Sequence, residues 1–356
     1  MNPLVVFQQT LRPRESAVFF SAVSRRYLTG FQSSDGVLFV TSSEAVLYLD
    51  SRYYEMACIK MQRGELASGL VIKPYVFQNE FSARSEKGEA PVAYFEDKTM
   101  TVAQFSSLQK RYPKTEFVPL GNRVEEMRIV KSPAEIEKIA TAQKLAEAAF
   151  LYILPRLEKG RTEYEVAAEL EYYMKKNGAS APSFPTICVS GTRSSLPHGR
   201  PENVLLTENS FLTLDFGCVL DGYASDMTRT VCLGKASEKM RLVYQTVLKA
   251  QLSALSAIRG GVSGKEVDAA ARNVIAEAGF GEYFGHSTGH GIGLKVHEAP
   301  SFSPSSEGTV PAGAVLSVEP GIYLPGEFGV RIEDLVVVEA DGIRNLNGVS
   351  KELMEL

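Results

Sequence analysis

The fold of the second half of the chain is decided by residues 211–230, FLTLDFGCVLDGYASDMTRT. Phe211–Phe216 and Asp226–Thr230 are rich in apolar and β-branched residues, which indicates two strands. Between them, Asp221-Gly222 is typical of a two-residue hairpin turn, because both residues tolerate a left-handed backbone. The stretch therefore predicts an antiparallel hairpin.

Two aspartates interrupt this apolar hairpin. With the turn described, Asp215 lies opposite Thr228 and Asp226 lies opposite Gly217. The aspartates are then diagonal neighbours on one face, about 7–8 Å apart at the backbone. Like charges this close repel unless a cation lies between them, so a metal site is the simplest explanation. The alternative is a pair of solvated aspartates on an open sheet face.

A second pair of carboxylates follows the same logic. Glu319 and Glu333 lie in two apolar runs on either side of Gly326. A turn centred on Gly326 places these two glutamates opposite each other. Asp334 is the alternative to Glu333, but in a strand its side chain points to the other face.

All four histidines lie in one window of the second half, at His198, His286, His290 and His297. Histidine is the commonest metal ligand, although any one histidine taken alone is more often structural. The glycines around His290 in GHGIG, residues 289–293, let the backbone approach a site closely. One histidine with four carboxylates suits manganese, cobalt or zinc, and four carboxylates indicate two ions that share bridging ligands.

Residues 1–120 alternate strand-like and helix-like stretches and predict a smaller α/β domain without histidine. The expected elements are a hairpin of Gly36–Val40 with Ala45–Leu49, strands at Val92–Phe95 and Phe117–Leu120, and a helix at Val102–Tyr112. Ser132-Pro133-Ala134-Glu135 is a capping box with proline at the first helical position, which marks the start of a long helix. The predicted domains are therefore 1–125 and 126–356.

An internal repeat indicates a duplicated helix–strand unit in the second domain. Residues 160–168, GRTEYEVAA, resemble GVSGKEVDA, which begins 101 residues later. Each segment predicts an N-terminal capping box, and the glycines that end the two helices, Gly178 and Gly279, keep the same separation. Chance similarity is the alternative. If the duplication is real, an active site can lie between the two halves.

Composition narrows the class of protein. With 356 residues, 44% of them hydrophobic, and a net charge of −4, the chain resembles a soluble globular protein without a nucleic-acid-binding surface. No apolar run is long enough to cross a membrane, and the polar segment Met1–Glu15 does not resemble a signal peptide, so we expect a cytoplasmic protein. No cysteines form a CxxC pair, and Cys188, Cys218 and Cys232 are expected in the core.

Seven short motifs together resemble the creatinase/prolidase/methionine-aminopeptidase family, the "pita-bread" peptidases. In chain order they are Leu196–Pro201, Asp215–Gly217, Asp226–Thr230, Gly289–Gly293, Val296–Glu298, Val318–Gly321 and Arg331–Asp334. The resemblance is strong over residues 130–345 and weaker at Tyr27–Phe31 and Asp50–Tyr53. It implies an α+β fold, in which a pita-bread catalytic domain with a pseudo-twofold repeat follows a smaller α/β creatinase-type N-terminal domain.

The resemblance also implies the metal ligands. Asp215 is expected to hold one ion, His290 and Glu319 the other, and Asp226 and Glu333 both. The cofactors would be two divalent ions, with manganese favoured and cobalt or zinc as alternatives.

Further roles follow from the same resemblance. His198 and His297 are expected to contact the substrate and the tetrahedral intermediate, and Glu319 to accept a proton from the attacking water. His286, Tyr323 and Arg331 are expected to make supporting or substrate contacts.

The implied activity is hydrolysis of the bond before a proline, as in bacterial Xaa-Pro dipeptidases and Xaa-Pro aminopeptidases. The N-terminal domain argues against a methionine aminopeptidase, and the complete ligand set argues against a creatinase. The expected partners are short proline-containing peptides and a second copy of the chain in a homodimer. The compact length favours a dipeptidase, and the alternative outside enzymes is an inactive relative that binds peptides or acts as a scaffold.

Overall fold

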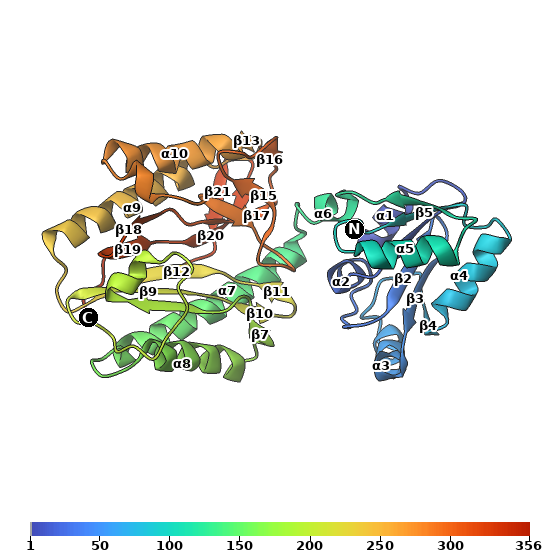
Figure 1. Cartoon of the computed structure of the whole chain (residues 1–356), viewed down its shortest axis with the longest axis horizontal. Coiled ribbons are helices and arrows are strands. Elements are labelled where there is room, and N and C mark those ends of the chain that lie inside the picture. Colours follow the sequence, from blue (N-terminus) through green and yellow to red (C-terminus); the bar gives the residue numbers. More distant parts are fainter. Residues whose placement is uncertain (1) are drawn as a thin grey trace. The chain divides into compact units, whose positions relative to one another are not determined.

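The computed structural model describes residues 2–356, which form two compact units that divide after Met127 (Figure 1). The boundary expected from the sequence lies after residue 125. Among the described residues, no helix is both long and apolar enough to cross a membrane. We refer to the two parts as the N-terminal unit and the C-terminal unit.

The N-terminal unit is built on a mixed six-stranded sheet with the order β4-β3-β2-β1-β5-β6. The strands are β1 (Glu15–Phe19), β2 (Val37–Thr41), β3 (Ala45–Leu49), β4 (Leu70–Pro74), β5 (Val92–Phe95) and β6 (Glu116–Pro119). β2 and β3 pair as an antiparallel hairpin, with Val37 opposite Tyr48, as the sequence predicts. The expected strands near residues 92 and 117 are β5 and β6.

Helices cover both faces of this sheet, because its central strands are apolar on both sides. In β2, Leu38 and Val40 pack into one buried cluster, and Val37 and Phe39 pack into another. The helices are α1 (Pro3–Gln8), α2 (Ala22–Thr29), α3 (Ser51–Gln62), α4 (Phe77–Glu86), α5 (Val102–Arg111) and α6 (Arg123–Met127). The helix expected at Val102–Tyr112 is α5.

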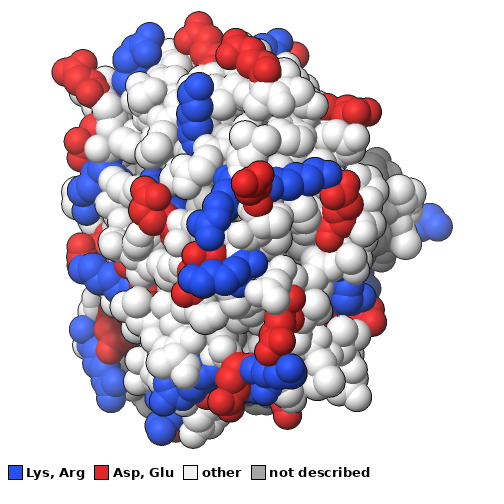
Figure 2. Space-filling view, turned by 90° about the vertical axis from the view of Figure 1, so that its left-hand side faces the viewer, with Lys and Arg blue, Asp and Glu red and all other residues white. Residues whose placement is uncertain are grey.

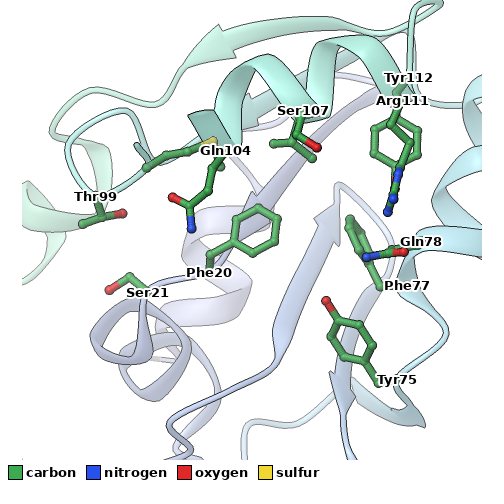
Figure 3. A pocket seen from close by; sticks show the side chains of 12 residues that line it. Phe20, Ser21, Tyr75, Phe77, Gln78, Thr99, Gln104, Ser107, Arg111 and Tyr112 are labelled. Atoms are coloured by element: carbon green, nitrogen blue, oxygen red, sulfur yellow. The ribbon is translucent and has the colours of Figure 1, made fainter. Parts of the chain in front are cut away.

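A cavity of about 330 Å³ lies beside α5 in the N-terminal unit (Figure 3). Phe20, Tyr75 and Phe77 supply aromatic surface, and Gln104 and Arg111 of α5 add polar groups. Its described lining contains neither a carboxylate nor a histidine, so it offers none of the groups expected at the active site.

The C-terminal unit consists of two halves, each of which has two long α-helices followed by antiparallel strands. Its helices are α7 (Pro133–Ile153), η1 (Leu154–Arg156), α8 (Glu163–Lys176), η2 (Gly191–Ser195), α9 (Glu238–Ala257), α10 (Gly264–Glu277) and η3 (Gly281–Tyr283). The strands of the first half are β7 (Ala181–Pro182), β8 (Ile187–Ser190), β9 (Ser210–Phe216), β10 (Cys218–Leu220), β11 (Tyr223–Ala224) and β12 (Met227–Leu233). Those of the second half are β13 (Val262–Ser263), β14 (Gly289–Gly291), β15 (Glu298–Phe302), β16 (Thr309–Val310), β17 (Val315–Val318), β18 (Gly321–Leu324), β19 (Phe328–Arg331), β20 (Asp334–Glu339) and β21 (Gly342–Asn345).

The internal repeat is present in the structure. α8 and α10 begin and end 101 residues apart, and both are followed by a left-handed glycine, Gly178 or Gly279. The long helix α7 begins at the predicted capping box. α8 also has a complete capping box. The box predicted for α10 is not formed, because the side chain of its N-cap residue Ser263 accepts a hydrogen bond from the amide of Lys265 rather than from that of Glu266.

Each half buries one face of its strands against its own helices. Leu212, Leu214 and Phe216 of β9 are fully buried in a cluster with α7 and α8. The second half forms a corresponding cluster with α9 and α10. Since side chains alternate along a strand, Thr213 and Asp215 point to the opposite face, away from the helices. The three expected core cysteines are buried.

Candidate active site

The hairpin register predicted from the sequence is present. β9 and β12 pair with Asp215 opposite Thr228, and the turn residues Asp221 and Gly222 have φ values of 47° and 74°. At Gly217 an added Cβ would lie 2.0 Å from the carbonyl oxygen of Ser225, so only glycine permits the two strands to approach this closely. Local turn chemistry thus fixes which face carries Asp215.

The second register also agrees with the prediction. The pairs Val318–Asp334 in β17–β20 and Gly321–Arg331 in β18–β19 lie on either side of Glu319 and Glu333. Asp334 makes an ion pair with Arg229, and it does not line the cleft that contains Glu333.

The expected ligands come from both halves and line one cleft of about 560 Å³. Asp226, His290 and Glu333 offer atoms that all lie within 4.8 Å of one another. Glu319 Oε1 is 3.2 Å from His290 Nε2. Asp215 lines the same cleft, but its Oδ2 accepts a hydrogen bond of 2.5 Å from Arg331.

The carboxyl groups of this cleft are buried, and the positive charge near them is too small to neutralise all of them. Burial and mutual repulsion raise the pKa values of Asp226 and Glu333 well above their usual range. Burial is also the main cause that raises the pKa of Asp215. Asp215 Oδ1 and Glu333 Oε1 are buried and have no hydrogen-bond partner in the described part of the chain. Free carboxylate oxygens in such a place fit divalent cations.

His290 and Glu319 form a charge-assisted pair beside these oxygens. Burial alone would lower the pKa of His290, but the hydrogen bond and charge of Glu319 raise it. Burial opposes ionisation of Glu319, yet His290 lowers the pKa of Glu319 to about 2. Glu319 is therefore ionised and able to accept a cation.

Two hydroxyl groups donate hydrogen bonds to the expected ligands, and neither belongs to the site residues expected from the sequence. Thr228 Oγ1 donates to Glu333 Oε2 at 2.8 Å, and Ser317 Oγ donates to Glu319 Oε1 at 3.0 Å. Both could have been found from strand alternation, because Thr228 faces Asp215 and Ser317 precedes Glu319 by two residues.

The expected supporting residues form a connected network. Arg331 donates to Asp215 and, at 2.6 Å, to the hydroxyl of Tyr323. The same hydroxyl lies 2.9 Å from His286 Nε2. Burial raises the pKa of Tyr323 to about 12, so its hydroxyl stays protonated, and burial lowers the pKa of His286.

The remaining two histidines line the outer part of the cleft. His198 and His297 are exposed, and the ring of His297 contacts His290 with centroids 4.3 Å apart. Burial and His290 lower the pKa of His297. The structure therefore brings every expected site residue to one cleft except Tyr323, which contacts the lining residues Arg331 and His286.

Comparisons with known proteins find a family match in each part of the chain. Residues 137–340 match the family described as "Metallopeptidase family M24". Residues 14–130 match the domain described as "Creatinase/Prolidase N-terminal domain". The "Uncharacterized peptidase YqhT" of Bacillus subtilis (strain 168) is 40% identical over 333 residues, 93% of each chain.

Two solved structures are similar over almost their whole length. A Xaa-Pro dipeptidase from Bacillus anthracis has a TM-score of 0.90 and 38% identity, covering 96% of this chain and 95% of that chain. An X-Pro aminopeptidase from Thermotoga maritima MSB8 has a TM-score of 0.90 and 33% identity, covering 98% and 100%. The two matched domains, the similar folds and the converging carboxylates confirm the resemblance read from the sequence, and the chain belongs to metallopeptidase family M24.

Proposed function

We propose that the chain is a Xaa-Pro dipeptidase that uses two divalent metal ions. The observation that carries this proposal is the buried group of Asp226, His290 and Glu333, with free carboxylate oxygens on Asp215 and Glu333. The names of the similar solved structures support cleavage before proline.

Five residues would hold the metals: Asp215, Asp226, His290, Glu319 and Glu333. Family membership implies divalent ions, and this oxygen-rich set fits manganese best, with cobalt and zinc as alternatives. Bound ions of this kind make a water molecule acidic enough to attack a peptide carbonyl and stabilise the charge that develops.

The protein supplies proton transfer and orientation. His290 and Ser317 both contact Glu319 Oε1, which leaves Oε2 to accept a proton from water. His198 and His297 lie along the cleft, where they can donate hydrogen bonds to the substrate and protonate the leaving nitrogen. Phe184, Pro185, Ile187, Pro197 and Val296 add apolar surface that suits a proline ring.

A second candidate is a Xaa-Pro aminopeptidase that acts on longer peptides. A further hollow, lined by Val219, Ala224, Leu294 and Lys295, shares Ser183, Val296 and His297 with the main cleft. Space beyond His297 would accommodate residues after the proline.

The test combines metal analysis with three substrates: Ala-Pro, Ala-Pro-Ala and Ala-Ala. A dipeptidase hydrolyses Ala-Pro, leaves Ala-Pro-Ala uncut and loses activity after metal removal, with recovery on adding Mn²⁺. Preference for Ala-Pro-Ala would favour the aminopeptidase. Two bound ions per chain without hydrolysis of any Xaa-Pro peptide would instead favour the inactive, peptide-binding alternative.

We also propose that the chain forms a homodimer through its N-terminal unit. This unit exposes large apolar side chains, with Met56 at 52%, Tyr75 at 45% and Val102 at 83%. Tyr75 also lines the cavity in Figure 3. Exposed apolar side chains are typical of an interface where they form one contiguous patch, so the proposal requires these three to lie on a shared surface. Light scattering should give the mass of two chains at micromolar concentration, and a monomer would contradict the proposal.

A further inference from the structure

A buried ionic cluster is centred on Glu298, the residue that follows His297 in the sequence. The side chains of Arg128 and Glu298 are each 5% exposed, and that of Lys131 is 2% exposed. Arg128 Nη2 donates to Glu298 Oε1, and Lys131 Nζ lies 3.6 Å from Glu298 Oε2. One carboxylate therefore faces two buried cations.

These cations depend on Glu298 for compensation. Arg128 Nε and Lys131 Nζ have no hydrogen-bond partner among residues 2–356. Burial lowers the pKa of Lys131, an effect that Glu298 opposes and Arg128 increases. Loss of the negative charge would leave two like charges buried together, which is strongly destabilising.

The same carboxylate shapes the loop that carries His297. The amide of Lys295 donates to Glu298 Oε1 at 2.9 Å, and the amide of Gly293 donates to the Lys295 carbonyl at 3.0 Å. A Cβ at Gly293 would lie 2.9 Å from Glu298 Oε2, so glycine permits the close approach of the carboxylate. Glu298 thus connects both ends of segment 293–298.

The ring of His297 depends on this backbone for its position. Within residues 2–356 it forms an edge contact with His290 but no hydrogen bond. The Lys131 amide donates to the Gly313 carbonyl, and this bond holds the segment with Arg128 and Lys131 against the rest of the C-terminal unit. The ionic cluster therefore joins a fixed segment to the loop bearing His297.

We propose that Glu298 is a positioning residue, which fixes His297 in the cleft by neutralising Arg128 and Lys131 and by closing segment 293–298. The proposal rests on the function proposed above, in which His297 contacts the substrate. It requires that removing the charge of Glu298 acts through the loop and through His297.

The first test is kinetic. Glu298→Gln should lower kcat for Ala-Pro by about 10²-fold, because a small displacement of a group acting on the substrate has an effect of this size. The metal content should stay at the wild-type value, and Glu298→Asp should recover part of kcat. The control Glu339→Gln, an exposed glutamate at the end of β20, should match the wild type. A wild-type kcat in Glu298→Gln would overturn the proposal.

Two double variants test how the effect is transmitted. Adding Lys131→Met to Glu298→Gln restores the original net charge of the cluster and should recover part of kcat. Adding Glu298→Gln to His297→Ala should lower kcat little further, since the two changes act through one group. Independent, fully additive losses would show that Glu298 does not act through His297.

Native-state trypsin cleavage after the exposed Lys295 provides a readout that does not need activity. Glu298→Gln should be cleaved faster than the wild type, and the Lys131→Met double variant more slowly than Glu298→Gln. Equal cleavage rates would overturn the positioning role. If the wild type hydrolyses no Xaa-Pro peptide, the proposed function fails, while cleavage still decides whether Glu298 holds the loop.

Discussion

At the scale of single residues, the site contains buried carboxyl groups and an exposed histidine that a substrate can reach. Asp226 and Glu333 are almost fully buried, at 4% and 1% exposed, and both have raised pKa values. His297 is exposed and makes no hydrogen bond in the described chain. Asp226 and Glu333 need a nearby cation to stay ionised, because burying an unpaired charge is unfavourable. His297 remains available to a substrate.

The first prediction concerns His297. His297→Ala should lower kcat by about 10²–10⁴-fold, because it removes the group that we propose transfers a proton or donates a hydrogen bond in the transition state. Metal content, measured by atomic absorption, should remain that of the wild type. In contrast, Asp226→Ala should lose both metal and activity. Loss of metal from His297→Ala would show that His297 is itself a ligand.

The second prediction concerns the hydroxyl of Thr228. Thr228→Val keeps the shape of the side chain but removes its bonds to Glu333 and Arg331. Metal affinity or activity should fall by about 10–100-fold, as expected for a group that orients a ligand. Thr213→Val is the matched control. The Thr213 hydroxyl lies on the same face of the sheet as that of Thr228, but it contacts Thr230 instead of a carboxylate. Equal effects of the two variants, measured by metal titration, would contradict a specific role for Thr228.

At the scale of elements, the two halves are joined by a buried ionic group behind the site. Arg229 of β12 bonds to Asp334 of β20 at 2.8 Å, and Lys351 bonds to the other oxygen of Asp334 at 2.8 Å. Arg229 also donates to the carbonyls of Val349 and Ser350. These bonds attach the C-terminal segment to both sheets.

The third prediction follows from this group. Arg229→Met should lower the free energy of unfolding by about 3–5 kcal/mol, because it leaves buried oxygens without a donor. The exposed pair Lys239–Glu327, with both side chains 51% exposed, offers a control. Lys239→Met should cost about 0–1 kcal/mol. Urea unfolding of both variants measures the difference, and equal losses would contradict this account.

At the scale of the whole molecule, charge is distributed differently on the surface and in the cleft. Figure 2 shows basic and acidic side chains interspersed on the face that it presents. The cleft instead gathers Asp215, Asp226, Glu319 and Glu333, with Arg331 as a buried cation. The net charge of −4 is small for a chain of 356 residues, whereas the site concentrates four carboxyl groups in one cleft.

The fourth prediction is metal-linked stability. If the cleft holds divalent ions only in the folded state, Mn²⁺ at about 100 times its Kd should stabilise the protein by about 2.7 kcal/mol. The Tm should rise with Mn²⁺ and fall with a chelator, as calorimetry can measure. Asp226→Asn should lose most of this response. An unchanged Tm in the wild type would contradict binding at this site.

Much of the fold could be predicted from the sequence, because it depends on turns, strand alternation and helix caps. The Asp221-Gly222 turn, strand alternation and helix caps predicted both registers and the repeated helices, because each depends on residues close together in the chain. The incomplete cap at Ser263 shows where this reasoning fails. A Cβ at Gly264 would lie 2.3 Å from the Ser301 carbonyl, a close contact that no local pattern reveals.

The sequence by itself thus determined the hairpins, the faces that carry Asp215 and Glu319, and, through its motifs, the family. Only the tertiary structure decided how the two halves meet, since Thr228 contacts Glu333 across more than a hundred residues. It also decided that Arg331 bonds to Asp215 and that Arg128 and Lys131 surround Glu298. Such contacts depend on burial and on charges brought together from distant segments, so they cannot be predicted from the periodicity of any single segment.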